Sequence, residues 1–433
     1  MLDLKLIRQE IDRVRAAVAI KRSPVDVDRL LWLDNARRDL LAEVETLKHE
    51  RNTVSKQIGA ERQRGGDAAA EMARMRQVGE AVDALDRRVH ALEEELNGLL
   101  AWVPNLPHAT TPPGASAEDN VVVRVEGEPR SGSAERRSHI ELGELLGILD
   151  PERAAKLSGA GFSVLKGRGA QLSRALISFM IDLHVSRHGY EEVATPYLAR
   201  PECLFGTGQL PKLREDMYHV GGDDLFLIPT AEVTITNLYR EETLREEELP
   251  RKHVGYTACF RREAGAAGRD TRGLLRVHQF DKVELVKFAH PDRSYEEHEA
   301  LLAEAESVLK ALGLHYRVVA LAAGDLSFAA AKCYDLEVWA PGEKRWLEVS
   351  SCSNFEDFQA RRIGIRMRPA GGGKTRFCHT LNASGVALPR LLVALLETYQ
   401  EESGEVRIPE PVRPYMGGLS VLRPEPAAAA RER

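Results

Sequence analysis

The first hundred residues carry apolar side chains at alternating spacings of three and four. This 3.5-residue repeat forms one apolar stripe along a helix and is typical of a coiled coil. It is unbroken from Met75 onward and weaker in the preceding segment, where Arg37 and Arg51 occupy two stripe positions. Gly65-Gly66-Asp67 between the segments is a turn signal, so we expect an antiparallel hairpin of two helices, each about 30 residues long. The stripe positions are Leu30, Leu33, Leu40, Val44, Leu47, Val54 and Ile58, then Met75, Val78, Val82, Leu85, Val89, Leu92, Leu96 and Leu99.

The pattern changes abruptly after Leu100. Four prolines fall within residues 101–120, which end the helix and predict an extended linker. The remaining chain alternates helical periodicity, as in 171–188, with strand-like runs such as VGYTACFRRE and HQFDKVELVKF. Successive strands with turn-like breaks favour an antiparallel sheet with helices packed on it. We therefore expect an α+β fold class, with a helical domain over 1–104 and a sheet domain over 105–433.

Composition narrows the class of protein. The 433 residues are 43% hydrophobic and 29% charged, as in a globular protein. The charged start MLDLKLIRQE lacks the apolar core of a secretory signal, and we find no apolar run that would span a membrane. The five cysteines are scattered without a C-x-x-C pair, which argues against a disulfide framework or a zinc cluster. We expect a cytoplasmic protein with no membrane partner and no zinc.

Charge is unevenly distributed along the chain. The 60 basic and 66 acidic residues give a net charge of −6, which argues against a strongly basic nucleic-acid binder. Basic residues nevertheless gather near the tip of the expected hairpin, and Arg74 and Arg76 follow on its return helix. The charge pattern leaves two interpretations open: a solvated helical face, or a surface that contacts a phosphate backbone. The basic residues before the turn are Arg51, Lys56, Arg62 and Arg64.

Charged residues also fall on expected strands. Strand alternation places Arg261 and Glu263 on one face, and Phe280, Lys282 and Glu284 on one face of the following strand. Charges on the core side of a sheet are costly unless they bind something, whereas the same residues facing water need no ligand. Alternation alone leaves both possibilities open.

Two other groups of residues are weaker candidates for chemistry. The string GGGKT at 371–375 is not a P-loop, because Arg368 stands where that motif requires glycine. His184, His278 and His379 lack metal-ligand spacing, so we expect packing or surface roles for them.

Longer strings carry a family resemblance. PTAE, FRREAGAAGRDTRGLLRVHQFDKVEL, LEVSSCSNFEDFQARR and TLNASGVALPRLL together resemble the bacterial-type seryl-tRNA synthetase family, and the resemblance spans nearly the whole chain. Three strings, GYEEVATPYL, the FRRE segment and GVALPRLL, are similar to the three motifs of class II aminoacyl-tRNA synthetases. The resemblance implies a coiled-coil arm joined to a class II antiparallel sheet flanked by helices, with the active site on the polar face of that sheet.

The resemblance also implies a role for each matching residue. Arg261, Arg390 and Glu348 would be catalytic. The L-serine site would comprise Thr230, Ala231, Glu232, Arg261, Glu284 and Ser384. The ATP site would comprise Arg261, Arg262, Glu263, Val277, Phe280, Glu348, Val349, Ser350, Ser351 and Arg390. Glu348 and Ser351 would hold Mg²⁺, which favours oxygen ligands, and tRNA would contact Arg51, Lys56, Arg62 and Arg64.

The implied activity is that of a serine–tRNA ligase. ATP would activate L-serine to seryl-adenylate, and serine would then pass to the 3′ end of tRNA(Ser); whether selenocysteine tRNA is also charged is left open. The implied assembly is a homodimer. Three other functions stay open: a catalytically inactive tRNA-binding copy, a ligase that charges a carrier protein, and a duplicate resistant to an inhibitor that mimics serine. The long hairpin argues against the carrier-protein ligase.

Overall fold

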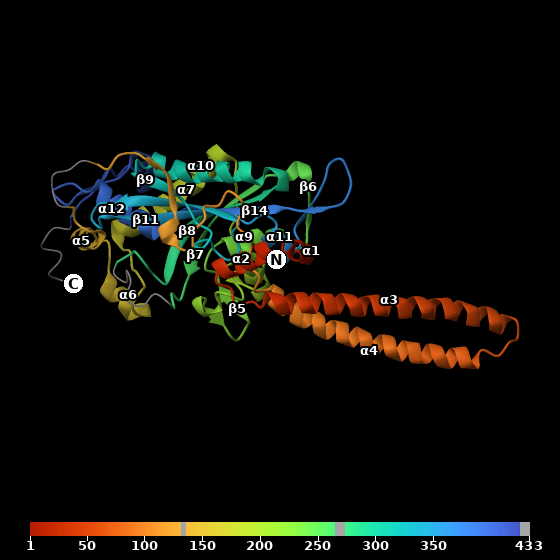
Figure 1. The fold of residues 1–433 in the computed structure, drawn as a ribbon. Helices are drawn as coiled ribbons and strands as arrows, with labels where there is room; N and C mark the ends of the chain where they lie inside the picture. The colour runs from red at the N-terminus through yellow and green to blue at the C-terminus, as the bar shows by residue number, and fades with distance from the viewer. Residues whose placement is uncertain (131–135, 265–272, 425–433) are drawn as a thin grey trace. The chain divides into compact units, whose positions relative to one another are not determined.

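The computed structural model describes residues 1–130, 136–264 and 273–424 (Figure 1). The chain divides into two compact units, Met1–Pro104 and Asn105–Arg433. Most of the AGAAGRDTRG stretch that follows FRRE in the sequence lies outside the described residues, and we expect a loop there. Among the helices of the described part of the chain, none is both long enough and apolar enough to cross a membrane.

The first unit is a helical hairpin preceded by two short helices, α1 (Leu4–Gln9) and α2 (Ile11–Ile20) (Figure 1). Its long arms are α3 (Val27–Gln63) and α4 (Ala69–Leu100), of 37 and 32 residues. Gly65 adopts a φ of 77° in the turn between them, a conformation that glycine tolerates without steric cost. The predicted hairpin is therefore confirmed.

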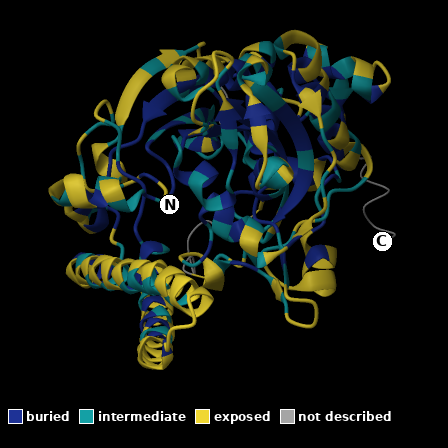
Figure 2. Ribbon diagram, turned by 90° about the vertical axis from the view of Figure 1, so that its right-hand side faces the viewer, coloured by how far each residue is buried: buried dark blue, intermediate teal, exposed yellow. Residues whose placement is uncertain are grey.

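The apolar stripe forms the contact between the two arms. Val44, Val82 and Leu85 make a buried cluster at the seam, while the outward faces of the hairpin are mostly exposed (Figure 2). Arg37 fits at its stripe position because its guanidinium reaches carboxylates on both arms, Asp34 at 3.4 Å and Glu93 at 3.2 Å. An ion pair thus replaces an apolar contact at this level of the coiled coil.

The second unit is built on one large sheet, whose strands are mainly buried (Figure 2). Every neighbouring pair of its eight strands is antiparallel except β2 and β7, which are parallel. The predicted α+β fold with a predominantly antiparallel sheet is confirmed. The strand order is β1 (Val121–Glu126), β9 (Tyr316–Ala320), β10 (Lys332–Ala340), β11 (Arg345–Asn354), β14 (His379–Ala387), β8 (Gln279–Ala289), β7 (Arg251–Phe260) and β2 (Glu191–Glu192).

The two faces of this sheet have different partners. On β8, Val283 and Leu285 point into an apolar core shared with three long helices, α7 (Gly167–His188), α10 (Ser294–Ala311) and α12 (Leu388–Tyr399). Val286 and Phe288 point the other way, into a second core with residues of α9 (Glu232–Thr236) and α11 (Phe358–Ile363). The second face is therefore apolar at one end of β8, and its polar residues lie toward the other end.

Shorter elements complete the second unit. The GGGKT segment lies between the short strands β12 and β13 and begins no helix, in agreement with the exclusion of a P-loop. The remaining short helices are α5 (His139–Leu145), α6 (Pro151–Ser158) and α8 (Pro201–Thr207). The remaining short strands are β3 (Leu198–Ala199), β4 (His219–Val220), β5 (Leu225–Leu227), β6 (Thr243–Arg245), β12 (Arg366–Arg368), β13 (Arg376–Phe377), β15 (Val406–Arg407) and β16 (Val421–Leu422).

Candidate active site

A cavity of about 680 Å³ opens over the polar part of the sheet in the second unit. Its floor comes from β8, β11 and β14, and its walls come from segments that follow β5 and β7. Most of the residues that sequence analysis assigned to serine, ATP or magnesium line this one space. They are Thr230, Glu232, Arg261, Glu263, Val277, Phe280, Glu348, Val349, Ser351, Ser384 and Arg390.

A β-bulge on β11 brings Glu348 and Ser351 to the same face. Residues three apart on a regular strand point to opposite faces. Here Glu348 pairs with Glu337 and Ser350 pairs with Leu336, which leaves Val349 as the extra residue. The extra residue shifts the alternation by one, and both oxygen-bearing side chains reach the cavity.

A second bulge on β14 does the same for Ser384 and Ala387. Ser384 pairs with Glu284 and Val386 pairs with Val283, so that Gly385 is the extra residue. A Cβ atom at Gly385 would lie 3.1 Å from Nε2 of His184 in α7, so glycine allows the strand to pack closely on that helix.

Arg261 directly follows β7, and its guanidinium forms no ion pair among the described residues. Its Nε donates to the Pro229 carbonyl oxygen at 3.4 Å, and its Cζ lies 5.1 Å from the centroid of the Phe280 ring. Among the described residues, no carboxylate lies within ion-pair distance of this guanidinium. Its planar fork of donors is suited to a carboxylate or phosphate ligand.

Glu263 is held in an unusual backbone conformation two residues further on. Its φ is 51°, which is uncommon for a residue other than glycine. Nη1 of Arg276, another cavity residue, lies 3.3 Å from its carboxylate. This conformation departs from strand geometry, so the simple alternation used to place Glu263 beside Arg261 does not apply here, although both residues line the cavity.

Arg390 of α12 and Glu348 of β11 line the cavity in contact with each other. Nη1 of Arg390 donates to the Glu348 carbonyl oxygen at 2.9 Å and lies 3.5 Å from its carboxylate, while Nε donates to the Leu275 carbonyl oxygen at 3.2 Å. The Glu348 side chain is 49% exposed, so its carboxylate oxygens can still accept a ligand. A carboxylate and the Ser351 hydroxyl in the same cavity form a donor set that suits Mg²⁺.

Two carboxylates lie at the deep end of the polar face. Glu284 is fully buried; Lys282 Nζ lies 2.5 Å from one of its oxygens and Asn382 Nδ2 donates to the other at 2.8 Å. Burial raises the pKa of Glu284, while Lys282 and Asn382 oppose the rise. The pKa of Glu232 is raised to about 7, first by burial and second by the Glu284 carboxylate.

Four of the predicted site residues do not line the cavity. Ala231 is buried in the core with α11, and the exposed Arg262 contributes its backbone N–H to the Asp216 carbonyl oxygen. The Ser350 hydroxyl donates to the Ser384 carbonyl oxygen at 2.6 Å, which ties β11 to β14. Glu284 shares its face with Phe280 and Lys282 as predicted; it does not line the cavity itself, but its two contacts, Lys282 and Asn382, do.

Sequence analysis missed several polar residues of this region, among them Asn382, Arg276 and Gln359. Asn382 and Arg276 line the cavity, and Gln359 contacts the Glu232 carboxylate from outside it. Asn382 and Arg276 each lie within a string that carried the family resemblance, two residues from Ser384 and one from Val277. Their closeness to assigned site residues within those strings was thus the signal that could have identified both. Gln359 also lies in such a string, LEVSSCSNFEDFQARR, but eight residues from Ser351, so the signal was weaker for it.

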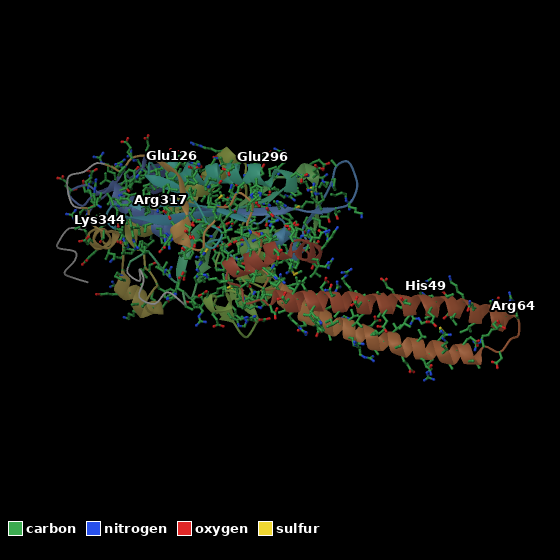
Figure 3. The ribbon with its side chains drawn as sticks, viewed as in Figure 1. His49, Arg64, Glu126, Glu296, Arg317 and Lys344 are labelled. Atoms are coloured by element: carbon green, nitrogen blue, oxygen red, sulfur yellow. The ribbon has the colours of Figure 1, made fainter. Side chains whose placement is uncertain are left out.

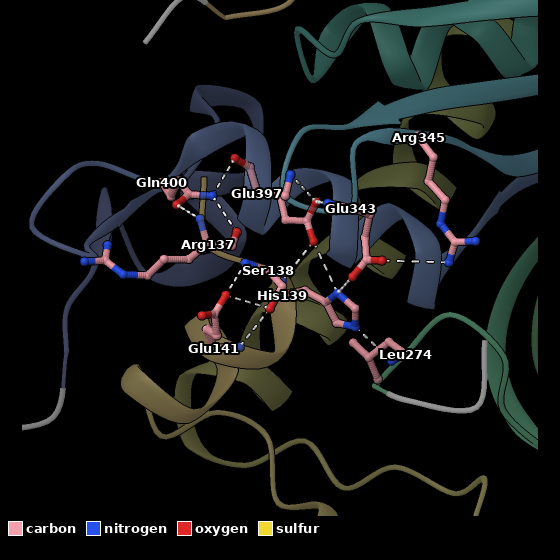
Figure 4. Close-up of polar contacts among 10 residues, drawn as sticks. Arg137, Ser138, His139, Glu141, Leu274, Glu343, Arg345, Glu397 and Gln400 are labelled. Carbon is pink, nitrogen blue, oxygen red and sulfur yellow. Dashed lines mark hydrogen bonds and ion pairs between the residues drawn. The ribbon is translucent and has the colours of Figure 1, made fainter. Parts of the chain in front are cut away.

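Near the cavity, His139, Glu343 and Glu397 come together in a way that resembles a metal site (Figure 4). Their atoms already have protein partners. His139 Nε2 accepts from the Leu274 N–H at 3.2 Å, so Nδ1 carries the proton that faces both carboxylates at 3.2 Å. Glu397 also accepts from the N–H groups of His139 and Gly342. The group therefore fixes the position of Leu274, which lines the cavity.

The predicted tRNA-binding residues all belong to the first unit. Basic residues elsewhere on the hairpin pair across the two arms, as Arg29 does with Glu95 at 2.8 Å and Lys48 with Asp86 at 3.1 Å. Within the described part of the chain, the four distal residues form no ion pair. Arg64 lies at the turn between the arms (Figure 3). The four are Arg51, Lys56, Arg62 and Arg64.

Comparisons with known proteins agree with the division into a helical and a sheet unit. The family model for the seryl-tRNA synthetase N-terminal domain matches residues 1–107. The model for the tRNA synthetase class II core domain (G, H, P, S and T) matches residues 217–399. A serine–tRNA ligase of Caldanaerobacter subterraneus is 54% identical over 98% of this chain and 100% of its own length. One from Geobacter sulfurreducens is 52% identical over the same shares.

Solved structures give the same result. The seryl-tRNA synthetase of Pyrococcus horikoshii, complexed with ATP, matches with a TM-score of 0.92 and 36% identity over 98% of this chain and 100% of that one. The cytoplasmic serine–tRNA ligase of Naegleria fowleri, in complex with AMP, matches with a TM-score of 0.87 and 29% identity over 98% and 99%. The chain therefore belongs to the seryl-tRNA synthetase family, the class II enzymes that ligate serine to tRNA.

Proposed function

We propose that the cavity binds L-serine and ATP side by side and joins them as seryl-adenylate, before serine is transferred to tRNA(Ser). The observation that carries this assignment is the guanidinium of Arg261, which forms no ion pair among the described residues and lines the same cavity as Glu232, Glu348 and Arg390. Two anions, the serine carboxylate and the α-phosphate, must meet for the reaction. A planar cation at their meeting point favours the approach of both.

Serine occupies the acidic end in this proposal. Its ammonium group is bound by the Glu232 carboxylate and the Thr230 hydroxyl, both of which line the cavity. Its hydroxyl is bound near Ser384, the strand partner of Glu284. Alanine lacks the hydroxyl and would leave buried polar groups of the site without a hydrogen-bond partner. Such a site discriminates between serine and alanine by a factor of order 10⁴–10⁵.

ATP occupies the remaining length of the cavity. The adenine ring stacks on Phe280 next to Val277, and its amino group donates to the Glu263 carboxylate. Arg390 binds the γ-phosphate, so the nucleotide is bent around Arg261. The two arginines at separate positions then hold the reacting and the departing phosphates apart.

The chemistry proceeds in two displacements. A serine carboxylate oxygen attacks the α-phosphorus in line, the bond to the bridging oxygen breaks, and pyrophosphate leaves. The terminal ribose hydroxyl of tRNA then attacks the activated carbonyl carbon, and AMP leaves. No covalent protein intermediate is required, so the residues act by positioning and by neutralising charge.

Magnesium fits one part of the cavity. Glu348 and Ser351 would hold the ion, because both present oxygen atoms on the same face of β11. When bound, Mg²⁺ neutralises phosphate charge and holds the polyphosphate in its bent form. Arg390, beside Glu348, would share its phosphate ligand.

The hairpin is the proposed tRNA-binding element. Arg51, Lys56, Arg62 and Arg64 carry the proposal, because their charges are not used in ion pairs among the described residues whereas those of Arg29 and Lys48 are. A long helical arm recognises RNA by shape and phosphate position more readily than by base sequence. We place the reaction in the cytoplasm, where scattered free thiols stay reduced.

Self-association into a homodimer completes the proposal. Strand β1 is an edge strand of the large sheet, and four of its valines are about half exposed, which is unusual for an edge left in water. A second copy covering this edge would bury them. Sedimentation of the purified chain would report a mass of two copies, and a single-copy mass at micromolar concentration would exclude it. The valines are Val121, Val122, Val123 and Val125.

Serylation of total tRNA by the purified protein tests the whole proposal, and ATP–pyrophosphate exchange tests its first step. Serine should support exchange, and alanine and threonine should not. Exchange without charging would indicate a carrier-protein ligase, and charging of selenocysteine tRNA transcripts in the same assay would extend the substrate range.

Arg261→Lys is expected to lower the rate of serine-dependent exchange about 10²- to 10³-fold, because lysine keeps the charge but not the bidentate fork. Arg245→Ala provides a matched control, since Arg245 is 74% exposed in the same unit and pairs only with Glu248 among the described residues. The control should exchange at the wild-type rate. Equal rates for both variants would refute the role of Arg261.

A further inference from the structure

The Glu232 carboxylate is contacted from behind by a buried amide, that of Gln359 on α11. Gln359 is fully buried and does not line the cavity. Its Nε2 donates to Oε1 of Glu232 at 2.7 Å. Within the described residues, no other side chain donates a hydrogen bond to this carboxylate, so Gln359 alone supplies this kind of support.

The amide can face only one way. Its Nε2 also donates to the Thr207 carbonyl oxygen at 3.2 Å, and its Oε1 accepts from the Thr380 hydroxyl at 2.6 Å. A carbonyl oxygen can only accept, so a reversed amide would set an oxygen against both the Thr207 carbonyl and the Glu232 carboxylate. Thr207 on α8 and Thr380 on β14 therefore fix the N–H toward Glu232.

The charge state of Glu232 is finely balanced. Burial and the Glu284 carboxylate of β8 raise its pKa to about 7. Three groups oppose this rise: the Gln359 hydrogen bond, Lys282 of β8, and Arg261 beyond β7. A hydrogen bond donated to the ionised form favours that form. Near neutral pH, a small loss of such support leaves much of the carboxylate protonated.

We propose that Gln359 is a positioning residue for serine recognition, which keeps Glu232 ionised and directs it at the ammonium group of the substrate. The inference rests on the proposed function, in which Glu232 binds that ammonium. Gln359 touches no substrate. It acts through Glu232, and Thr380 acts through Gln359, so a chain of three buried groups leads from β14 to the substrate.

Gln359→Glu is the primary test, because it keeps the shape of the side chain and replaces the amide by a carboxyl group whose ionised form cannot donate and repels the Glu232 carboxylate. Near pH 7 the KM for serine in ATP–pyrophosphate exchange should rise about 10- to 100-fold, whereas the KM for ATP should change little. The acid limb of kcat/KM for serine should move to higher pH by about one unit or more, because Glu232 then ionises later. Wild-type values should be approached at alkaline pH.

Thr380 gives a second, independent pair of variants. Thr380→Val removes the hydroxyl that orients the amide and should shift the acid limb in the same direction, by less than Gln359→Glu does. Thr380→Ser keeps the hydroxyl and should restore the wild-type profile. Thermal unfolding of each variant, monitored by circular dichroism, identifies any loss of activity that is caused by a destabilised fold. If Gln359→Glu yields no folded protein, the Thr380 pair decides the question alone.

Glu232→Gln separates this inference from the function on which it rests. An unchanged serine KM in Glu232→Gln would refute the ammonium site itself. A raised serine KM in Glu232→Gln, combined with a wild-type acid limb in Gln359→Glu, would refute the role of Gln359 and leave the site standing. A merely structural role for Gln359 predicts that kcat and both KM values worsen at every pH, with no movement of the acid limb, and this result would also overturn the proposal.

Discussion

Glu284→Ala is expected to abolish serine-dependent ATP–pyrophosphate exchange. The change removes the carboxylate that contacts both Lys282 and Asn382, two residues that line the cavity in which we propose that serine binds. Without it, the buried Lys282 cation and the Asn382 amide lose the partner that holds them in place, and the discrimination of order 10⁴ that a site built for a hydroxyl provides should be lost. Exchange measured with serine and with alanine reports both effects.

The experiment needs a control for the cost of breaking a buried ion pair, which is about 3–5 kcal/mol. Glu306→Ala provides one. The Glu306 side chain is 1% exposed and lies 2.5 Å from the Arg124 guanidinium, and neither residue lines the cavity. It should lower the melting temperature and leave the serine KM unchanged. Glu284→Gln keeps an acceptor for Asn382 and should retain more activity than Glu284→Ala. Wild-type exchange in a folded Glu284→Ala would disprove the assignment.

Deleting residues 40–92 is expected to remove tRNA charging and spare adenylate formation. The deletion takes away the four distal cations of the hairpin and leaves every cavity residue in place. Arg37 and Glu93 contact each other at 3.2 Å across the two arms, so a short glycine–serine linker can join the cut ends. Serylation and exchange, measured on the same preparation, separate the two steps.

A milder variant tests the charges themselves. Replacing Arg51, Lys56, Arg62 and Arg64 by alanine keeps the hairpin and should weaken tRNA binding. The logarithm of affinity should also depend less steeply on the logarithm of salt concentration, by somewhat under one unit for each phosphate that the variant no longer neutralises. Normal charging by the deletion variant, or an unchanged salt dependence in the alanine variant, would refute the role of the hairpin.

The hairpin could be predicted from the sequence almost in full. Its stripe is a local, repeated signal, and the 3.5 spacing from Met75 to Leu99 leaves no other regular structure in which those residues share a face. Arg37 shows the limit of the pattern, because the stripe alone does not indicate that Asp34 and Glu93 would compensate its charge. Short elements such as β2 and β3 have two residues each and carry no periodic signal.

The residues of the cavity were identified mainly by resemblance, and their arrangement was less predictable. Alternation placed Phe280, Lys282 and Glu284 together, but it does not say where along a strand a polar face becomes a core. On β8 that change falls between Lys282, which lines the cavity, and Val286, which packs with α9 and α11. Glu284 lies at this boundary, so its distance from the open cavity depends on helices that come from distant parts of the sequence.

The bulge at Val349 links the number of residues in β11 to the faces on which its side chains lie. Glu348 and Ser351 are three positions apart, and both reach the cavity because the bulge takes up one extra residue. A substitution at Val349 that keeps a similar apolar volume leaves the register intact, so exchange should persist. A deletion of Val349 leaves the two residues two positions apart, and a regular strand then still places both side chains on one face. In β11 the extra residue and the bulge are therefore needed together, and relatives that lack the one should also lack the other.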